Sequence, residues 1–504
     1  MSVRARVEPP AVADEPERVV AWRPVLIVAA VVAVVLGVTS AGYGYFGDEY
    51  YFLAAGARPA AGYADQPPLL PLLAAALDRL APGSLVVLRL PATLMTAAGT
   101  VFAALLAVEF GGRRRAQVLA AVATAISPYL LATGHLLATS TVDPFLWSVV
   151  LLLVVRWIRF EHEGRPRDRL LLGVGLVTAV ALFDKILIPV LLAALAVGVL
   201  VAGPRRMLAR LLLWVGLVAA AASTVPTVLW QAAHGWPQAR MGSVVSGESG
   251  LFGDRWQFLP RALYYAGLLP GAVLALVGVW ALLRRDALRP WRSVGIAVLL
   301  ATAALLAAGG RPYYTSGLYA VVFAAGAVAV EAGALGRWRW TVGRSSVVVS
   351  TLLTALWVLP VGPAAWRAPI DFEVMGQLGW PELADSVAAR YDALPPDVRA
   401  HTAVVAFSYW YASALEREGP PRGLPATIYS THRGFGYFAP PPDADTTALL
   451  VGAPPWVARG CATLVPLAPH VGPGPNPVND RVPMALCTPR RPWSVAWPSL
   501  RNLA

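Results

Sequence analysis

The stretch "PVLIVAAVVAVVLGVTSAGYGYFGDEYYF", residues 24–52, joins an apolar run long enough to cross a lipid bilayer to a loop rich in acidic and aromatic side chains. No small-residue cleavage site follows the run, so we expect a retained membrane helix and not a signal peptide. Of the 504 residues, 57% are apolar and only 14% are charged, whereas about a quarter are charged in a soluble domain. The sequence therefore predicts an integral membrane protein.

Ten further apolar runs follow the first one. The eleven runs cover residues 24–42, 86–108, 117–134, 141–155, 170–183, 187–202, 211–230, 263–283, 293–308, 316–333 and 346–362. They predict an all-α polytopic membrane bundle of about eleven spanning helices within residues 24–364. Residues 1–23 mix Arg, acidic residues and Pro, which is typical of a disordered cytoplasmic tail.

The loops between the runs differ in charge. If the N-terminus is cytoplasmic, the five inside loops hold 18 Arg in 49 residues, while the outside loops hold 7 Lys or Arg in about twice that length. The positive-inside rule then fixes the orientation. The net charge of +12 is explained by these loops, so we expect no nucleic-acid partner. The Arg bias and the compact loops are typical of a multi-pass protein of a bacterial plasma membrane.

An odd number of spans places residues 365–504 outside the cytoplasm. This segment has Pro-rich turns between short runs such as "TAVVAF" at 402–407 and "TALLVG" at 447–452, which predict a small extracytoplasmic α/β domain. Cys461 and Cys487 both lie in it. A disulfide can persist in that compartment, and two buried free thiols are the alternative.

Acidic residues gather in the first outside loop, residues 43–84. A carboxylate at this depth can act as general base for an acceptor hydroxyl that attacks an activated sugar, which needs no cofactor, and Asp48 is the candidate. The alternative is that Asp48 caps a helix. Residues 50–57 are expected to form a short amphipathic helix on the membrane surface.

Lys185 is the only lysine among 41 basic side chains. It lies in "LFDKILIP" between two apolar runs on the outer side, where a compact ammonium could neutralise a phosphate that gains charge as it leaves. The neighbouring Asp184 could tune it or pair with it. The alternative is an interfacial lysine that extends to water.

His135 and Asp143 bracket the third and fourth spans in "ATGHLLATSTVDPFLW". A metal-linked Asp-His pair is one interpretation, so a divalent metal stays open as a cofactor. The favoured alternative is a hydrogen-bonded His135 within the bundle and an Asp143 that caps the next helix before Pro144. The sequence contains no Gly-rich phosphate loop, no His or Cys cluster of metal-ligand spacing and no nucleophile elbow.

The segment "GGRPYYTSGLY" enters the tenth span from outside. Arg311 could grip a phosphate there, and Tyr313 and Tyr314 could line a sugar or polyprenyl groove, with interfacial anchoring of the rings as the alternative. The outside loop 231–262 is long and rich in Gly and Ser, and it is a candidate lid over a site.

Five short segments together resemble a known family. They are "FGDEYYF" at 46–52, "DQPPL" at 65–69, "LRLPATL" at 88–94, "FDK" at 183–185 and "RPYY" at 311–314. The chain resembles the family 39 glycosyltransferases, of the C-type membrane fold shared by protein O-mannosyltransferases and lipid A aminoarabinose transferases, over about residues 24–335. The resemblance implies transfer of a sugar from a polyprenyl-phosphate carrier to a protein, lipid or polysaccharide acceptor outside the cytoplasm, with inversion at the anomeric carbon.

The resemblance also implies roles for single residues. Asp48 matches the catalytic acidic residue of the family, Glu49 falls on the second acid of the pair, and Lys185 matches a basic position near the carrier phosphate. Asp65 and Gln66 stand where the aminoarabinose transferases carry a basic residue, so contact with the acceptor is an alternative there to contact with phosphate.

Arg89 matches the Arg of the "RLP" segment, and extension to water at a helix end is its alternative role. A transporter or flippase of lipid or glycan is the main alternative function for the chain, since many spans with a few buried charges would also fit it. Against that alternative, the polar candidates gather at one membrane face.

Overall fold

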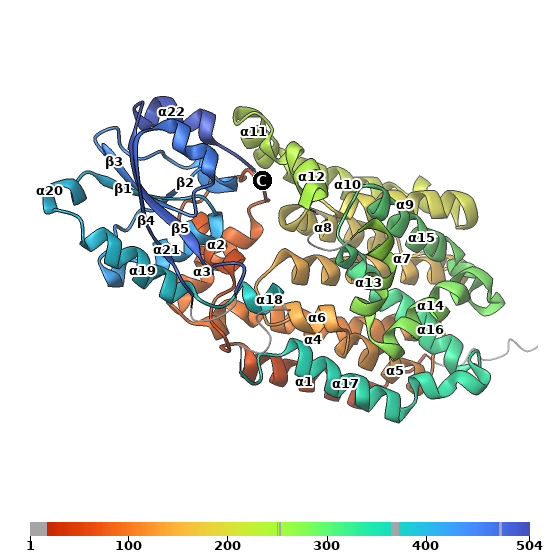
Figure 1. The fold of residues 1–504 in the computed structure, drawn as a ribbon. Coiled ribbons are helices and arrows are strands. Elements are labelled where there is room, and N and C mark those ends of the chain that lie inside the picture. Colours follow the sequence, from red (N-terminus) through yellow and green to blue (C-terminus); the bar gives the residue numbers. More distant parts are fainter. Residues whose placement is uncertain (1–17, 249, 251–253, 364–371, 473–475, 504) are drawn as a thin grey trace, which may run out of the picture.

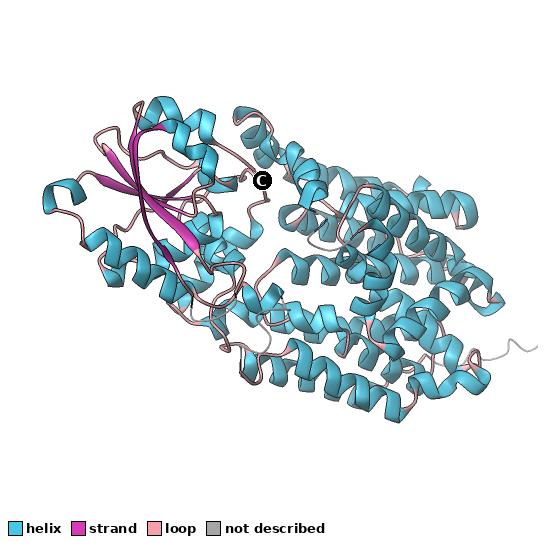
Figure 2. Ribbon diagram, viewed as in Figure 1, coloured by secondary structure: helices cyan, strands magenta, loops and turns pink. Residues whose placement is uncertain are grey.

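The computed structural model of the chain describes residues 18–248, 250, 254–363, 372–472 and 476–503. A helical bundle makes up most of it, and a smaller domain built on a sheet lies against one end of the bundle (Figures 1 and 2). Residues 1–17 of the tail predicted at 1–23, and the domain boundary predicted at 364/365, lie outside the described residues. The end of that predicted tail is corrected, because α1 already begins at Trp22.

Each of the eleven apolar runs is a helix or a helix pair. The bundle contains α1 (Trp22–Thr39), α4 (Leu85–Glu109), α5 (Arg114–Ala125), α6 (Pro128–Thr133), α7 (Thr139–His162), α8 (Arg169–Asp184), α9 (Ile188–Ala202), α10 (Leu211–Ser223), α11 (Val225–Ala233), α12 (Pro237–Gly247), α13 (Phe258–Ala266), α14 (Leu269–Arg284), α15 (Arg292–Ala307), η5 (Pro312–Leu318), α16 (Tyr319–Glu331) and α17 (Arg344–Val358). The all-α membrane bundle is thereby confirmed.

The number of full spans is smaller by helix length alone. Within the described ranges, seven helices are long and apolar enough to cross a membrane, or eight if α13 and α14, bent by 111° at their junction, form one span. With 16 and 15 residues, α8 and α9 are shorter than the roughly 20 residues that a span needs. That all eleven runs cross the bilayer stays a prediction.

Glycines let the helices of the bundle approach closely. A Cβ on Gly175 of α8 would lie 2.2 Å from the backbone of Gly216 in α10, and one on Gly198 of α9 would lie 2.2 Å from the Ser293 carbonyl oxygen in α15. Water cannot drive helices together within lipid, so small residues that permit backbone contact supply the packing energy instead. Replacing Gly175 or Gly198 would push these helix pairs apart.

The arginine-rich loops meet at one end of the bundle. Glu109 at the end of α4 pairs with Arg156 and Arg159 near the end of α7, each at 2.6 Å, and Glu161 pairs with Arg210 before α10 at 3.0 Å. The sheet domain lies at the other end (Figure 1). This segregation of positive charge is the arrangement that the orientation argument from the sequence expects.

The C-terminal domain is a small α/β unit, as predicted. It contains α18 (Phe372–Met375), α19 (Trp380–Asp392), α20 (Pro396–Arg399), β1 (Thr402–Ala406), α21 (Tyr409–Glu418), β2 (Tyr429–Ser430), η9 (Arg433–Tyr437), β3 (Thr447–Val451), β4 (Cys461–His470), β5 (Val482–Pro489) and α22 (Trp493–Leu500). The strand order is β2-β1-β3-β5-β4, with β1 parallel to β2 and β3 and with β5 antiparallel to β3 and β4. Both predicted strand segments are strands, β1 and β3.

Alternate residues of the central strands pack on opposite faces of the sheet, as the two-residue period of a strand requires. Val404 and Leu449 face the side that holds α19 and α21, whereas Val405 and Leu450 face α22. Cys461 and Cys487 form a disulfide between β4 and β5, which settles the alternative that the sequence left open. Such a bond persists in an oxidising compartment.

The first outside loop carries the C-terminal domain. It forms α2 (Gly47–Gly56) and α3 (Leu69–Leu80), and α21 packs directly on α2. Arg58 pairs with Glu416 at 2.5 Å, and Arg417 pairs with Asp78 at 2.9 Å. The predicted amphipathic surface helix is therefore corrected: α2 is buried along nearly its whole length, because a folded domain covers the face that was expected to meet lipid.

Candidate active site

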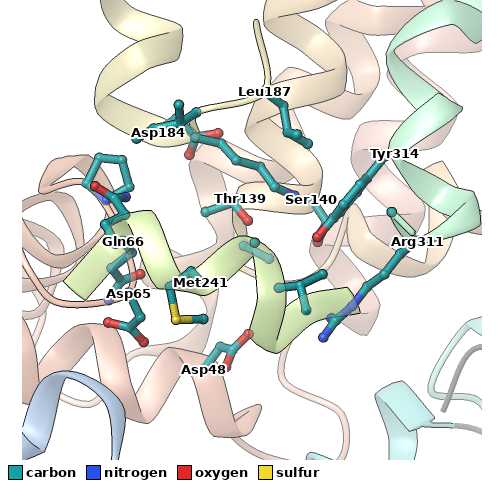
Figure 3. A pocket seen from close by; sticks show the side chains of 18 of the residues that line it. Asp48, Asp65, Gln66, Thr139, Ser140, Asp184, Leu187, Met241, Arg311 and Tyr314 are labelled. Atoms are coloured by element: carbon teal, nitrogen blue, oxygen red, sulfur yellow. The ribbon is translucent and has the colours of Figure 1, made fainter. Parts of the chain in front are cut away.

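A cavity of about 920 Å³ lies where the bundle, the first outside loop, α12 and the C-terminal domain meet (Figure 3). Seven of the candidate residues line it: Asp48, Asp65, Gln66, Lys185, Arg311, Tyr313 and Tyr314. They come from four separate segments of the chain, so the fold gathers most of the polar outer-face residues into one site. Four other candidates, Glu49, Arg89, His135 and Asp143, are buried behind the lining.

Asp48 lies in the first turn of α2 and faces the cavity. Its Oδ1 atom accepts hydrogen bonds from the Tyr409 hydroxyl at 2.8 Å and from the Trp410 indole nitrogen at 2.7 Å. The helix is capped elsewhere, because Phe46 is the N-cap and the Glu49 carboxylate accepts from its backbone N–H at 2.9 Å. The interpretation of Asp48 as an N-cap is therefore wrong, and its second oxygen is left to face the cavity.

Asp65 and Gln66 follow α2 and enter the same wall. The Tyr51 hydroxyl donates to Asp65 Oδ1 at 2.6 Å. Burial raises the pKa of the Asp65 carboxyl, and the nearby Arg433 guanidinium opposes that rise. Gln66 is buried, and among the described residues its amide nitrogen has no hydrogen-bond partner. An unmatched donor in a cavity wall is suited to a hydroxyl or carbonyl of a substrate.

Lys185 lies across the cavity from this loop, directly after α8. Its ammonium lies over the Tyr314 ring, 4.2 Å from the centroid, and 5.9 Å from the centroid of Tyr313. The Arg311 guanidinium donates to the Tyr313 hydroxyl at 2.9 Å. Lys185 therefore lines the site with its ammonium packed on these rings. The two tyrosines hold both cations on one wall.

Glu49 and Arg89 form a fully buried pair behind Asp48. Arg89 donates to both Glu49 oxygens, at 2.8 and 2.7 Å, and to the backbone carbonyls of Ser40 and Gly44. Glu49 also accepts from the Leu137 backbone N–H at 2.9 Å. The pair ties the end of α1, the first loop and the segment before α7 together. With no exposed surface at all, Arg89 does not extend to water.

His135 and Asp143 are both buried in the bundle. Asp143 lies inside α7, which begins at Thr139, and it accepts from the Trp147 indole at 2.9 Å. The interpretation of Asp143 as a cap is therefore wrong, since the helix starts one turn earlier than the Pro144 signal suggested. Across the described part of the chain, no group of three or more His, Cys, Asp or Glu side chains is placed to hold a metal ion.

Several residues of the site were not predicted from the sequence. Tyr409 and Arg433 of the C-terminal domain line the cavity, and Glu248, which follows α12, pairs with Arg433. The clusters "FSYWY" at 407–411 and "HRGFGYF" at 432–438 were the available signal, but nothing local places them beside Asp48. Asp184 also lines the cavity, and within the described residues neither of its buried oxygens has a hydrogen-bond partner. The suggested pairing of Asp184 with Lys185 is not seen.

Comparisons with known proteins show which fold and which family the chain resembles. Residues 65–230, about a third of the chain, match the family model described as dolichyl-phosphate-mannose-protein mannosyltransferase. The crystal structure of ArnT from Cupriavidus metallidurans in the apo state matches with a TM-score of 0.59 at 15% identity, covering 95% of this chain and 99% of that chain. The chain therefore shares the fold of ArnT, and residues 65–230 are similar to that mannosyltransferase family.

Two further solved structures match. ArnT bound to undecaprenyl phosphate matches with a TM-score of 0.58 at 15% identity, over 92% of this chain and 97% of that chain. The archaeal oligosaccharyltransferase AglB from Archaeoglobus fulgidus, in complex with an inhibitory peptide and a dolichol-phosphate, matches with a TM-score of 0.46 at 15% identity, over 80% of this chain and 64% of that chain. A search of curated proteins gave no match. Because the ArnT match covers 95% of the chain, the fold shared with ArnT includes the C-terminal domain.

Proposed function

We propose that this glycosyltransferase moves a sugar from a polyprenyl-phosphate carrier to an acceptor hydroxyl outside the cytoplasm, with inversion and with Asp48 as general base. The observation that carries the proposal is a single cavity lined by Asp48 and by two cations, Lys185 and Arg311, which neighbouring tyrosines hold. An activated sugar needs only these two functions together with correct positioning.

The proposed transfer step uses Asp48 and the two cations. The acceptor oxygen bonds to the anomeric carbon as the bond from that carbon to the phosphate oxygen breaks, and Asp48 takes the hydroxyl proton. A single displacement inverts the anomeric centre. The leaving phosphate gains negative charge, which Lys185 and Arg311 stabilise from fixed positions on the tyrosines. Tyr409 and Trp410 hold one oxygen of Asp48, so the other is aimed at the acceptor.

Apolar side chains also line the cavity. Leu187, Val190 and Val228 are among the lining residues. This lining supports a lipid-linked donor, because a prenyl chain can stay in the hydrocarbon region while its phosphate reaches the cations. ArnT, which shares the fold, is described bound to undecaprenyl phosphate, and that carrier class is the one we propose here.

The acceptor is proposed to approach from the side of Asp65 and Gln66. Both residues belong to the loop that also carries Asp48 and line the cavity, and the buried amide nitrogen of Gln66 has no hydrogen-bond partner among the described residues. A protein, lipid or glycan hydroxyl would fit this position. The roles proposed for Glu49, Arg89, His135 and Asp143 are indirect, since they support the wall and do not line it.

The proposed orientation places the cavity and the C-terminal domain outside the cytoplasm and the N-terminus inside, in a bacterial plasma membrane. Arginine-rich loops at the opposite end and the Cys461–Cys487 disulfide support it.

The test is transfer of labelled sugar from a panel of polyprenyl-phosphate sugars to extracytoplasmic acceptors, with purified protein in liposomes. Asp48→Asn should lower the transfer rate by about 10²- to 10⁴-fold, the usual contribution of a general base. Lys185→Ala should lower it as well, through loss of charge at the phosphate. Asp254→Asn, the same chemical change at an exposed acid, is the matched control and should transfer at the rate of the wild type. Full activity of a folded Asp48→Asn variant would refute the assignment of the base.

A further inference from the structure

A carboxylate pairs with two arginines of the cavity wall. Glu248, the residue after α12, accepts from Arg311 at 2.7 Å with one oxygen and from Arg433 at 2.8 Å with the other. Arg311 belongs to the bundle and Arg433 to the C-terminal domain, and both line the cavity. One anionic group therefore bridges the two parts of the molecule.

The backbone conformation of Arg433 and the packing of its guanidinium together fix the position of its charge. Its backbone has φ of +50°, in the left-handed region that non-glycine residues rarely adopt and that is enriched at functional sites. Its guanidinium packs over the Tyr409 ring, 4.7 Å from the centroid, and Tyr409 in turn donates to Asp48. The strained backbone thus aims a cation at the same small region as the proposed base.

Glu248 follows a helix, α12, that packs only weakly on the rest of the protein. Of the eleven residues of α12, only Pro237 is buried. In contrast to the buried acid that pairs with Arg89, Glu248 is partly exposed. An acid on a weakly packed helix can leave its partners at a low cost, whereas the two arginines are fixed by tyrosines.

We propose that Arg311 and Arg433 form one subsite for the phosphate of the lipid donor, and that Glu248 fills this subsite until the donor displaces it. The inference rests on the function proposed above and adds to it a phosphate ligand from the C-terminal domain and a built-in competitor. A carboxylate and a phosphate both present paired oxygens that match guanidinium groups, but the phosphate gains charge during the reaction. Binding of the donor then frees α12 and keeps the C-terminal domain engaged through Arg433.

Binding tests this without any need for transfer. The dissociation constant of polyprenyl phosphate is measured for purified protein in detergent by native mass spectrometry. Glu248→Gln keeps the size of the side chain and removes its charge, so the apparent dissociation constant should fall by roughly three- to tenfold as the internal competitor is lost. Arg433→Gln should raise it by about tenfold or more, since a charged ligand of the phosphate is removed.

The double variant and two controls sharpen the result. When Arg433→Gln is already present, Glu248→Gln should improve the binding free energy of polyprenyl phosphate by less than half as much as it does in the wild type. The reason is that the shared subsite has lost one of its two arginines. Glu161→Gln removes an acid that also pairs with arginine, at the other end of the bundle, and should leave the dissociation constant unchanged. The prenyl alcohol of equal length should bind all variants with the same dissociation constant. If its dissociation constant changed among the variants as much as that of polyprenyl phosphate does, the assignment of a phosphate subsite would be overturned.

Failure of this inference is distinct from failure of the proposed function. Wild-type protein that binds no polyprenyl phosphate would refute the donor class. If the wild type binds polyprenyl phosphate and folded Glu248→Gln binds it no more tightly, only the role of Glu248 as competitor is refuted. If Arg433→Gln does not fold, Arg433→Lys, which keeps the charge but not the two-pronged geometry, should still weaken binding. Wild-type affinity in the lysine variant would count against Arg433 as a phosphate ligand.

Discussion

Two groups of acids and arginines lie on either side of Asp48, and they differ in almost every physical respect. Glu49 and Arg89 are fully buried, and backbone carbonyls and N–H groups satisfy the remaining positions of both side chains. Glu248, Arg311 and Arg433 line or border a cavity and join three separate segments. The first group holds the fold together, while the second presents charge to whatever enters.

The difference shows how neighbouring acids acquire different roles. Asp48 and Glu49 are adjacent in the sequence, but on a helix they point about 100° apart. Glu49 turns toward the bundle and meets Arg89, and Asp48 turns toward the cavity and meets Tyr409 and Trp410. A pair of acids that looks like a single motif is thus one structural residue and one proposed catalytic residue.

The largest effect is expected when the buried pair is broken. Glu49→Gln should leave the Arg89 charge buried and without its partner, which typically lowers the free energy of unfolding by about 3–5 kcal/mol. Thermal unfolding in detergent should show a large loss of stability, with little folded protein recovered. Asp392→Asn, at the exposed pair of Arg399 and Asp392, should change the stability by less than about 1 kcal/mol. A Glu49→Gln protein as stable as the wild type would contradict the structural role.

The helical bundle could be predicted from the sequence because each membrane helix is encoded by one continuous apolar segment. An apolar run must satisfy its own backbone hydrogen bonds, so composition over about twenty residues suffices to predict a helix. The lone Lys185 and the acids of the first loop were found in the same way, since polar groups at membrane depth stand out in the sequence. All three features depend on residues that are close together in the chain.

The rest of the site depends on contacts between distant segments. Tyr409 and Asp48 are 361 residues apart, and Arg433 and Glu248 are 185 residues apart. Neither distance leaves a periodic or compositional trace. The burial of α2 was missed for the same reason, because its cover, α21, could not be seen from the loop itself. Pairings of this kind become visible only when the tertiary structure is known.

A smaller effect is expected from the hydroxyl that links the two groups. Tyr409 donates to Asp48 and lies beneath the Arg433 guanidinium. Tyr409→Phe keeps the ring under Arg433 and removes the donor, so kcat for sugar transfer should fall by about tenfold, as a hydrogen bond to a charged group is lost. The KM for the donor should change less than kcat.

Tyr411→Phe is the matched control for this prediction. Its hydroxyl lies on the same helix, α21, but donates at 2.6 Å to the Val478 carbonyl, which is in no contact with Asp48. This variant should lose no more than twofold in kcat by the same reasoning about hydrogen bonds. Equal losses in both variants would indicate that damage to α21, and not the donor to Asp48, is responsible.

The smallest effect concerns the charge around Arg433. Burial, aided by the Arg433 charge, lowers the pKa of His432 to about 3, so this histidine is neutral in the folded protein at any pH at which the enzyme is handled. The unfolded chain takes up the proton below its ordinary pKa of about 6.5, so acid favours the unfolded state. Stability from this residue is therefore complete above pH 6.5 and declines as the pH falls toward 3, by about 1 kcal/mol between pH 7.5 and 5.5.

His432→Gln cannot titrate, and the decline of its melting temperature over that range should be shallower than that of the wild type. Equal slopes for the two proteins would show that His432 is protonated in the fold, and the region around Arg433 would then carry a second positive charge at mildly acidic pH.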